Sequence, residues 1–167
     1  FVPTGSAGYD FYGANRKGQN LFSDCLLALD AKTGKRKWHY QFVHHDMWDR
    51  DIPAPPNLIQ VERNGKKIDA VAQITKQGFV FLFERATGKP LFDIKEVPVP
   101  ASQLKGEMAW KTQPRPVLPK PYGRQANELT LADINPYSSK KETLIETFKS
   151  IDKRWFAPPS ETGTMIF

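Results

Sequence analysis

The chain has 167 residues and a net charge of +6, and 40% of its residues are hydrophobic. This length suits one domain with its own core and is too short for two. Aromatic residues make up 12% of the chain, which argues against general disorder despite its 14 prolines and 11 glycines. The positive charge comes from dispersed lysines, without a basic stripe interleaved with aromatics. It therefore predicts a solvated surface and no nucleic-acid partner.

Two segments, Leu26–Trp38 and Val80–Phe92, repeat one pattern. In each, a short apolar strand leads into a polar turn that ends in Thr-Gly-Lys, and a second strand follows. Gly34 and Gly88 supply the positive φ that such a hairpin turn needs. The spacing of the two turns is close to the period of a β-propeller blade once a loop insertion is allowed.

Two more strands are expected between these turns, at 57–63 and 67–75, because Asn64-Gly65 is a strong hairpin signal. Together with 78–83 and the strand after Gly88, they predict a four-stranded antiparallel sheet. Such a sheet is one complete propeller blade.

The character of the chain changes after Val97. Recurring prolines over 97–123 predict an extended surface excursion. A short helical turn is expected at 130–134, capped by Thr130.

A longer helix is expected from a cap at Ser138 or Ser139 to about Asp152. Its apolar residues share one face, which predicts packing rather than a binding groove. These residues are Leu144, Ile145, Phe148 and Ile151.

The expected fold class is all-β: a partial β-propeller of one complete blade and parts of its neighbours, with a Pro-rich excursion and a short helix. The blade region is expected at 1–96, the Pro-rich and helical insertion at 97–160, and the start of a further blade at 161–167. Since the chain starts at Phe1 and ends in an apolar run, we expect a fragment of a longer protein.

The segment His44–Pro53 concentrates titratable side chains. In an extended chain Asp49 and Asp51 point to the same side, where they could hold a hard cation or raise one another's pKa for proton abstraction. The adjacent rings of His44 and His45 face opposite sides, which argues against a joint zinc site. Taken alone, Asp46 is equally explained as a turn cap.

The chain resembles the pyrroloquinoline-quinone-dependent (quinoprotein) alcohol and glucose dehydrogenases, which are eight-bladed β-propellers of the periplasm. The order and spacing of the motifs match over roughly residues 4–100, and residues 156–164 resemble the glucose dehydrogenase branch. The motifs are Leu27–Gln41, His45–Asp49, Thr75-Lys76, Gly78 and Phe81–Arg85.

The resemblance implies roles for individual residues. Asp49 falls on the catalytic aspartate, which takes the substrate hydroxyl proton while hydride moves to the quinone C5 carbon. Lys76 falls on the cationic side chain beside the quinone carbonyls. Trp38 matches a tryptophan that packs one blade on the next.

The resemblance also implies a metal ion, Ca²⁺, Mg²⁺ or a lanthanide, that bridges the cofactor and the aspartate. Asp49 and Asp51 are the candidate metal ligands. Ser6 stands where the family usually has an asparagine ligand, and a hydroxyl is a weaker, neutral ligand, so metal binding is expected to be altered or lost.

The implied protein is periplasmic, soluble or membrane-attached. It oxidises a sugar, glucose-like, or an alcohol with pyrroloquinoline quinone as cofactor, and passes electrons to a quinone or a cytochrome. The isolated chain is expected to bind no cofactor, to be inactive and to self-associate through its strand edges.

Two alternatives remain at this point. One is a non-catalytic propeller scaffold or binding module of the same superfamily, which would need Trp38 but not Asp49 together with Lys76. The other is an unrelated metal hydrolase, against which the spacing of the histidines argues.

Overall fold

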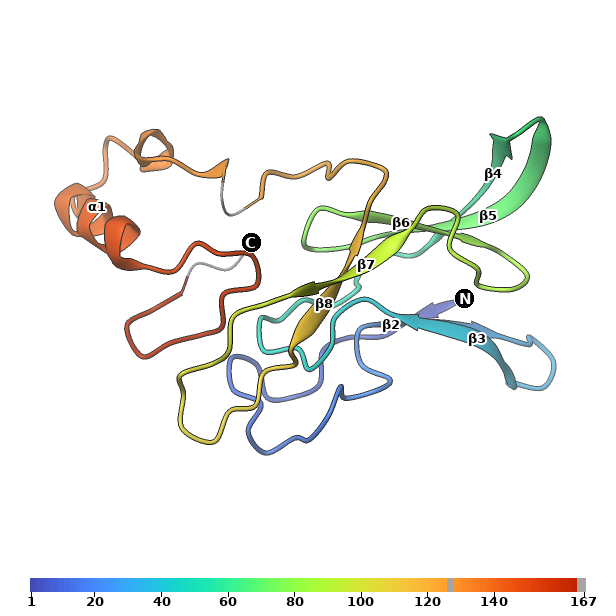
Figure 1. Ribbon diagram of the computed structural model, residues 1–167, viewed down its shortest axis with the longest axis horizontal. Coiled ribbons are helices and arrows are strands. Elements are labelled where there is room, and N and C mark those ends of the chain that lie inside the picture. Colours follow the sequence, from blue (N-terminus) through green and yellow to red (C-terminus); the bar gives the residue numbers. More distant parts are fainter. Residues whose placement is uncertain (126–127, 165–167) are drawn as a thin grey trace.

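The computed structural model describes residues 1–125 and 128–164. Its strands form three antiparallel sheets, β1-β2-β3, β4-β5-β6 and β7-β8; Figure 1 shows their arrangement. Within the described residues, no helix has both the length and the apolar character needed to cross a membrane. The elements are β1 (Val2–Pro3), β2 (Cys25–Leu29), β3 (Arg36–Gln41), β4 (Asn57–Arg63), β5 (Lys66–Ile74), β6 (Val80–Glu84), β7 (Ile94–Pro98), β8 (Thr112–Pro116), the 3-10 turn η2 (Leu131–Asp133) and α1 (Lys141–Ser150).

Both Thr-Gly-Lys turns have the expected backbone. Gly34 and Gly88 have φ of +69° and +73°, and each donates its N–H at 2.9 Å to the carbonyl four residues earlier, of Asp30 and Glu84 respectively. The Asn64-Gly65 turn between β4 and β5 also has positive φ at both residues, as a type I′ turn requires.

The predicted all-β partial propeller is confirmed, but the blade lacks a full fourth strand. After the Gly88 turn, pairing with β6 consists of one bridge between Phe83 and Pro90 and two hydrogen bonds, from the N–H of Glu84 to the carbonyl of Lys89 and from the N–H of Leu91 to the carbonyl of Leu82. Pro90 lies between these two bonds, at a position whose N–H would point away from β6, so the ladder tolerates it. The pairing ends at Leu91, where the chain bends.

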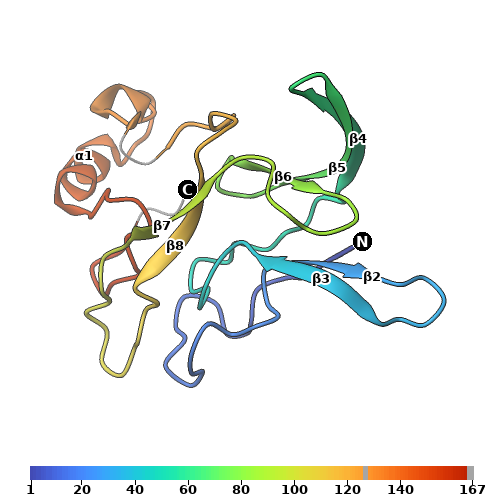
Figure 2. The same ribbon diagram turned by 45° about the vertical axis from the view of Figure 1, so that its right-hand side comes forward.

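The first two sheets pack face to face through one aromatic core. Trp38 of β3 lies against Phe83 of β6, with ring centroids 5.8 Å apart, and its Nε1 donates to the carbonyl of Arg85 at 3.0 Å. A Cβ added to Gly88 would come within 2.6 Å of the Trp38 ring. Trp38 therefore packs one sheet on the next. Figure 2 shows the β2-β3 and β4-β5 hairpins, one from each sheet, extending to the right-hand side.

The Pro-rich excursion predicted after Val97 carries a regular hairpin, in which β7 pairs with β8, while residues 99–111 between them form no strand. The flanking hydrogen bonds, from Val99 N to Lys111 O and from Val117 N to Asp93 O, show that the odd-numbered residues carry the ladder. Pro98, Pro114 and Pro116 occupy even-numbered positions, whose missing N–H groups would point away from the partner strand.

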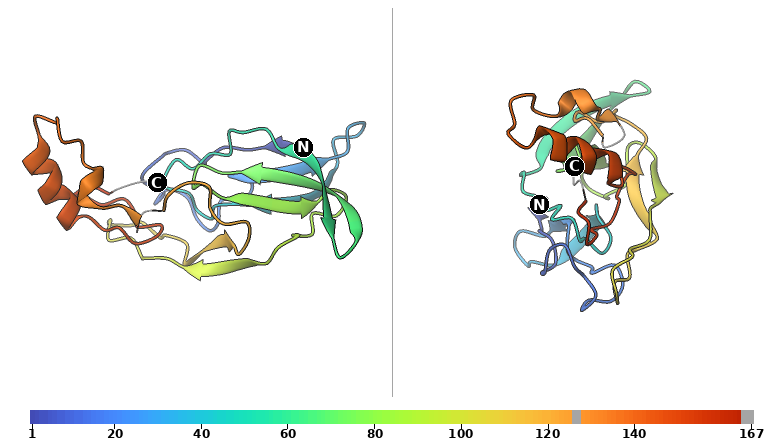
Figure 3. Two further views of the ribbon diagram at one scale, coloured as in Figure 1. Left: turned by 90° about the horizontal axis from the view of Figure 1, so that it is seen from above. Right: turned by 90° about the vertical axis from the view of Figure 1, so that its left-hand side faces the viewer.

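The C-terminal part follows its predictions only in outline. Thr130 caps η2 as expected, with its N–H bonded to Asp133 Oδ2 at 2.8 Å. The N-cap of α1 is Lys140 and not a serine, and no residue of the helix is buried. Of the stripe, Leu144 is exposed and Ile145, Phe148 and Ile151 are half-buried, and Figure 3 shows α1 standing apart from the sheets. Gly163 and Thr164 form no strand, and the rest of the expected final strand lies outside the described residues.

Candidate functional site

The structure brings Asp49, Asp51 and Lys76 together. Lys76 lies in the turn between β5 and β6, and its Nζ donates to the carbonyl of Asp49 at 2.8 Å and to Asp51 Oδ2 at 3.1 Å. Asp49 Oδ1 lies 3.4 Å from the same nitrogen. The three side chains are 37–44% exposed, so the cluster faces solvent.

Asp46 folds the loop that presents the two carboxylates. Its Oδ1 accepts the N–H of Trp48 at 2.8 Å and its Oδ2 accepts the N–H of Arg50 at 2.7 Å. Trp48 and Arg50 are both buried, so Asp49 and Asp51, which alternate with them, are left on the open side. Asp49 has φ of +55°, a conformation that a non-glycine residue adopts only when its surroundings impose it.

The buried pair anchors this loop to the C-terminal segment. The Nε1 of Trp48 donates to the carbonyl of Ala157 at 2.7 Å, and the Arg50 guanidinium lies 4.0 Å from the centre of the Phe156 ring. Loss of solvation lowers the pKa of Arg50 to about 10, so it stays charged at neutral pH.

Ser6 fixes Asp51 through its backbone and not through its hydroxyl. The N–H of Ser6 donates to Asp51 Oδ1 at 2.6 Å, while its hydroxyl donates to Asp46 and lies 3.4 Å from Asp24 Oδ1. Asp24 is fully buried, and burial together with the nearby charge of Asp46 raises its pKa to about 8. The hydroxyl of Ser6, where the resemblance leads us to expect an asparagine ligand, is thus already engaged.

The two carboxylates of the cluster differ electrostatically. Partial loss of solvation and the hydrogen bond with Asp51 raise the pKa of Asp49, against the opposing effect of Lys76. The N–H of Ser6 and the ammonium of Lys76 lower the pKa of Asp51. Burial opposes the charge of Lys76, but its ion pairs prevail and raise its pKa. Asp49 is therefore the better proton acceptor of the two.

The cluster fits part of a metal site. Carboxylate oxygens suit Ca²⁺, which takes about 6–8 oxygen ligands. Over residues 1–125 and 128–164, no three His, Cys, Asp or Glu side chains come together as a metal site. Asp49 and Asp51 would hold such an ion only with donors from elsewhere.

The rings of His44 and His45 make separate sets of contacts. The His44 ring contacts Gln41 and Glu96, and the His45 ring contacts Gly18 and Glu107. The glutamates, and Gln113 beside them, lie on or between β7 and β8. These partners could not be found from the sequence, because no local pattern links them to the histidines.

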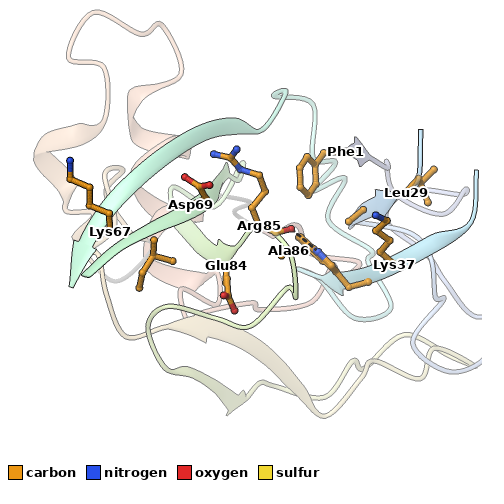
Figure 4. Close-up of a pocket in the computed structure, with 11 residues that line it drawn as sticks. Phe1, Leu29, Lys37, Lys67, Asp69, Glu84, Arg85 and Ala86 are labelled. Carbon is orange, nitrogen blue, oxygen red and sulfur yellow. Dashed lines mark hydrogen bonds between the residues drawn. The ribbon is translucent and has the colours of Figure 1, made fainter. Parts of the chain in front are cut away.

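A cavity of about 620 Å³ lies between the first two sheets, away from this cluster (Figure 4). Phe1, Lys37, Trp38 and Arg85 are among its lining residues, and Asp49, Asp51 and Lys76 are not. It adjoins the Trp38 contact and belongs to the packing of the two sheets.

The fold and this cluster define a partial β-propeller that carries two carboxylates and a lysine beside one sheet. A family model described as "Glucose/ethanol/alcohol dehydrogenase, beta-propeller domain", for PQQ enzymes, matches residues 1–167. The chain belongs to this family of PQQ-dependent dehydrogenases.

Relatives agree with this assignment. The chain is 35% identical to the quinoprotein glucose dehydrogenase of Escherichia coli K12 over all of its length and 21% of the relative. It is 44% identical to the probable quinate dehydrogenase (quinone) of Xanthomonas campestris pv. juglandis over 68% of the chain and 15% of the relative. The chain thus spans about a fifth or less of the length of these curated relatives.

A solved structure also matches. The crystal structure of the quinohemoprotein alcohol dehydrogenase from Comamonas testosteroni superposes with a TM-score of 0.51 and 29% identity, over 70% of this chain and 17% of that one. This similarity supports the partial propeller.

Proposed function

We propose that the chain supplies the general-base segment of a PQQ-dependent dehydrogenase that oxidises a sugar or an alcohol. The observation that carries the proposal is the convergence of Asp49, Asp51 and Lys76 on one solvent-facing side, with Lys76 Nζ within 3.4 Å of both carboxylates. The quinone, when bound, supplies the carbon that accepts hydride.

Each residue has a distinct task in this proposal. Asp49 takes the proton of the substrate hydroxyl, which suits its raised pKa. Lys76 provides a fixed positive charge next to the base and toward the quinone oxygens. Asp51, kept ionised by Ser6 and Lys76, contributes a carboxylate to a Ca²⁺, Mg²⁺ or lanthanide ion together with Asp49.

The proposed substrate class is polyhydroxylated. Relatives that match most or all of the chain are named for glucose, quinate and glycerol. A glucose-like sugar is favoured because three of the matching relatives are glucose dehydrogenases that cover the whole chain. We further propose a periplasmic protein, soluble or membrane-attached, that passes electrons to a quinone or a cytochrome.

The test uses the natural protein that contains residues 1–167, reconstituted with PQQ and Ca²⁺ and assayed by dye reduction with aldoses, polyols and simple alcohols. We expect Asp49→Asn to lower kcat by at least about a hundredfold, since general-base catalysis contributes roughly that much. Asp93→Asn, at an exposed residue away from the cluster, is the matched control and should match wild type.

Two results would refute the proposal. Equal activity of Asp49→Asn and wild type would show that Asp49 is not the base. A folded wild type that is inactive with every substrate and metal would favour a propeller scaffold instead.

For residues 1–167 alone we propose an inactive, self-associating chain. Among the described residues, the outer edges of β3 and β4 pair with no further strand, and unpaired edges are templates for association. Sedimentation analysis should detect oligomers, and a clean monomer at micromolar concentration would contradict this.

A further inference from the structure

The β7-β8 hairpin holds the segment that precedes the carboxylate cluster. Three of its side chains, on the two strands and the connection between them, contact His44 and His45. They are Glu96, Glu107 and Gln113. The contacts come from a part of the chain 52 to 69 residues away in sequence.

Gln113 holds the backbone of His44 from both sides of the peptide. Its Oε1 accepts the N–H of His44 at 2.8 Å, and its Nε2 donates to the carbonyl of His44 at 2.7 Å. The glutamine is completely buried, so water cannot replace either bond. One side-chain amide thus does for His44 what a neighbouring strand would do.

Glu107 holds the side chain of His45 in the same way. Glu107 accepts the N–H of Gly13 on one oxygen and the N–H of Met108, at 2.9 Å, on the other. The second oxygen also lies 3.0 Å from His45 Nε2. The side chains of Glu107 and His45 are only 0% and 1% exposed, respectively.

The hydrogen-bond pattern also orients the His45 ring. Its Nδ1 faces the carbonyl of Gly18 at 2.7 Å, and a carbonyl only accepts, so Nδ1 carries a proton. Its Nε2 faces Glu107 Oε1, so His45 and Glu107 form a buried hydrogen-bonded pair.

The backbone conformation of His45 determines where the loop 46–51, which carries Asp49 and Asp51, begins. His45 has φ of +48°, so its backbone is held in a conformation that the surroundings impose. The carbonyl of the next residue, Asp46, accepts a hydrogen bond from the Arg16 guanidinium at 2.8 Å. The carboxylate of Asp46 accepts the backbone N–H groups of Trp48 and Arg50. Asp49 lies between those two residues.

We propose that Glu107 and Gln113 are positioning residues for the general base: by fixing His45 and His44 they set where Asp49 is presented beside Lys76. This inference rests on the proposed function of Asp49. Glu107 and Gln113 are buried and their polar atoms are hydrogen-bonded, so they act through the loop and touch neither substrate nor cofactor. The β7-β8 hairpin thereby takes part in the chemistry of Asp49, although it lies outside the cluster.

The test measures Glu107→Gln in the same reconstituted natural protein. The variant keeps the shape of the side chain but places an NH₂ group against a backbone N–H or against His45, where a carboxyl oxygen stood. We expect kcat to fall roughly 10- to 100-fold, the effect of a misplacement of about 1 Å. KM and the fraction of protein loaded with PQQ should stay within about twofold of wild type.

A kinetic isotope effect separates positioning from damage to the fold. With glucose deuterated at C1, the isotope effect on kcat should rise in Glu107→Gln, because a displaced base slows the chemical step itself. Glu62→Gln on the exposed face of β4 is the control and should match wild type. Glu107→Asp keeps the carboxyl group and should recover part of the lost kcat.

Gln113→Glu provides a second variant should Glu107→Gln not fold. It still accepts the N–H of His44, but it puts an oxygen against the carbonyl of His44, and the same fall in kcat is expected. A loaded, folded variant with wild-type kcat overturns the proposal, as does a fall in kcat with an unchanged isotope effect. If Asp49→Asn is inactive while both variants are fully active, only the positioning role fails and the proposed function stands.

Discussion

Alanine substitutions at Gly34 and Gly88 separate the backbone cost of a hairpin turn from the cost of crowding Trp38. The two glycines occupy equivalent turn positions with φ of +69° and +73°. A Cβ at Gly34 meets nothing within 4 Å, whereas a Cβ at Gly88 would lie 2.6 Å from Trp38 Cδ2 and 2.8 Å from two further ring carbons. The two variants share a backbone penalty and differ in one steric contact.

The magnitudes follow from these contacts. Positive φ costs alanine about 1–2 kcal/mol more than glycine, so Gly34→Ala should lower the free energy of unfolding by about that amount. The Trp38 ring cannot simply move aside, because it is tied to the carbonyl of Arg85 at 3.0 Å and packed on Phe83. Overpacking adds about 1–3 kcal/mol, so Gly88→Ala should cost roughly 2–5 kcal/mol.

Urea unfolding followed by tryptophan fluorescence measures the difference, at one fixed protein concentration because self-association would shift the midpoint. In a Trp38→Leu background, where the ring is absent, the two alanine variants should differ much less. Equal destabilisation in the wild-type background would show that the Trp38 contact does not hold the two sheets together.

Three further substitutions test the buried and exposed parts of the fold. Asp24 has its pKa raised from 3.8 to about 8 by burial, so the folded state keeps a proton that the unfolded state loses between those values. Wild type should therefore lose stability as pH rises from about 4 to about 8, and Asp24→Asn should flatten this part of the stability–pH curve; parallel curves would contradict it. Trp48→Phe leaves the carbonyl of Ala157 without its 2.7 Å donor, which should cost about 1–3 kcal/mol in urea unfolding, and an unchanged midpoint would argue against that bond. Leu144 is 42% exposed on α1, so Leu144→Ser should change the free energy of unfolding by less than about 0.5 kcal/mol; a larger loss would mean that the helix packs after all.

The hairpins around Gly34 and Gly65 could be predicted because every determinant is local. In the first turn Asp30 Oδ1 accepts the N–H groups of Lys32 and Thr33 at 3.1 and 3.0 Å, and the glycine supplies the positive φ. Such contacts span two to four residues, and residue preferences record them directly. The all-β fold followed from these turns and from the apolar strands beside them.

The packing of the apolar stripe of α1 could not be predicted, for the opposite reason. Its spacing correctly indicated a helix, and the helix forms over Lys141–Ser150. Periodicity shows that one face is apolar, but it says nothing of whether another element is there to cover it. None of the residues of α1 is fully buried, and the cation that lies over the Phe148 ring is that of a nearby lysine, Lys153, and not of a residue of the sheets.

The candidate site also contains residues that the sequence indicated and residues that it could not indicate. Lys76 taken alone is a turn lysine before Gly78, and only the family resemblance singled it out; the structure supplies the independent reason, an ammonium held between Asp49 and Asp51. Glu107 and Gln113 had no signal at all, because their partners are 62 and 69 residues away. Prolines at alternate positions limit what a two-stranded sheet can gain from further strand pairing, so β7 and β8 attach to the rest of the fold through buried side-chain hydrogen bonds instead. Such bonds require one register and one rotamer, so they favour a single arrangement of the hairpin against the His44-His45 segment. A segment with these properties is suited to fixing the place of a reactive carboxylate. In the proposed role, the β7-β8 hairpin does this by binding His44 and His45, which directly precede the loop that carries Asp49.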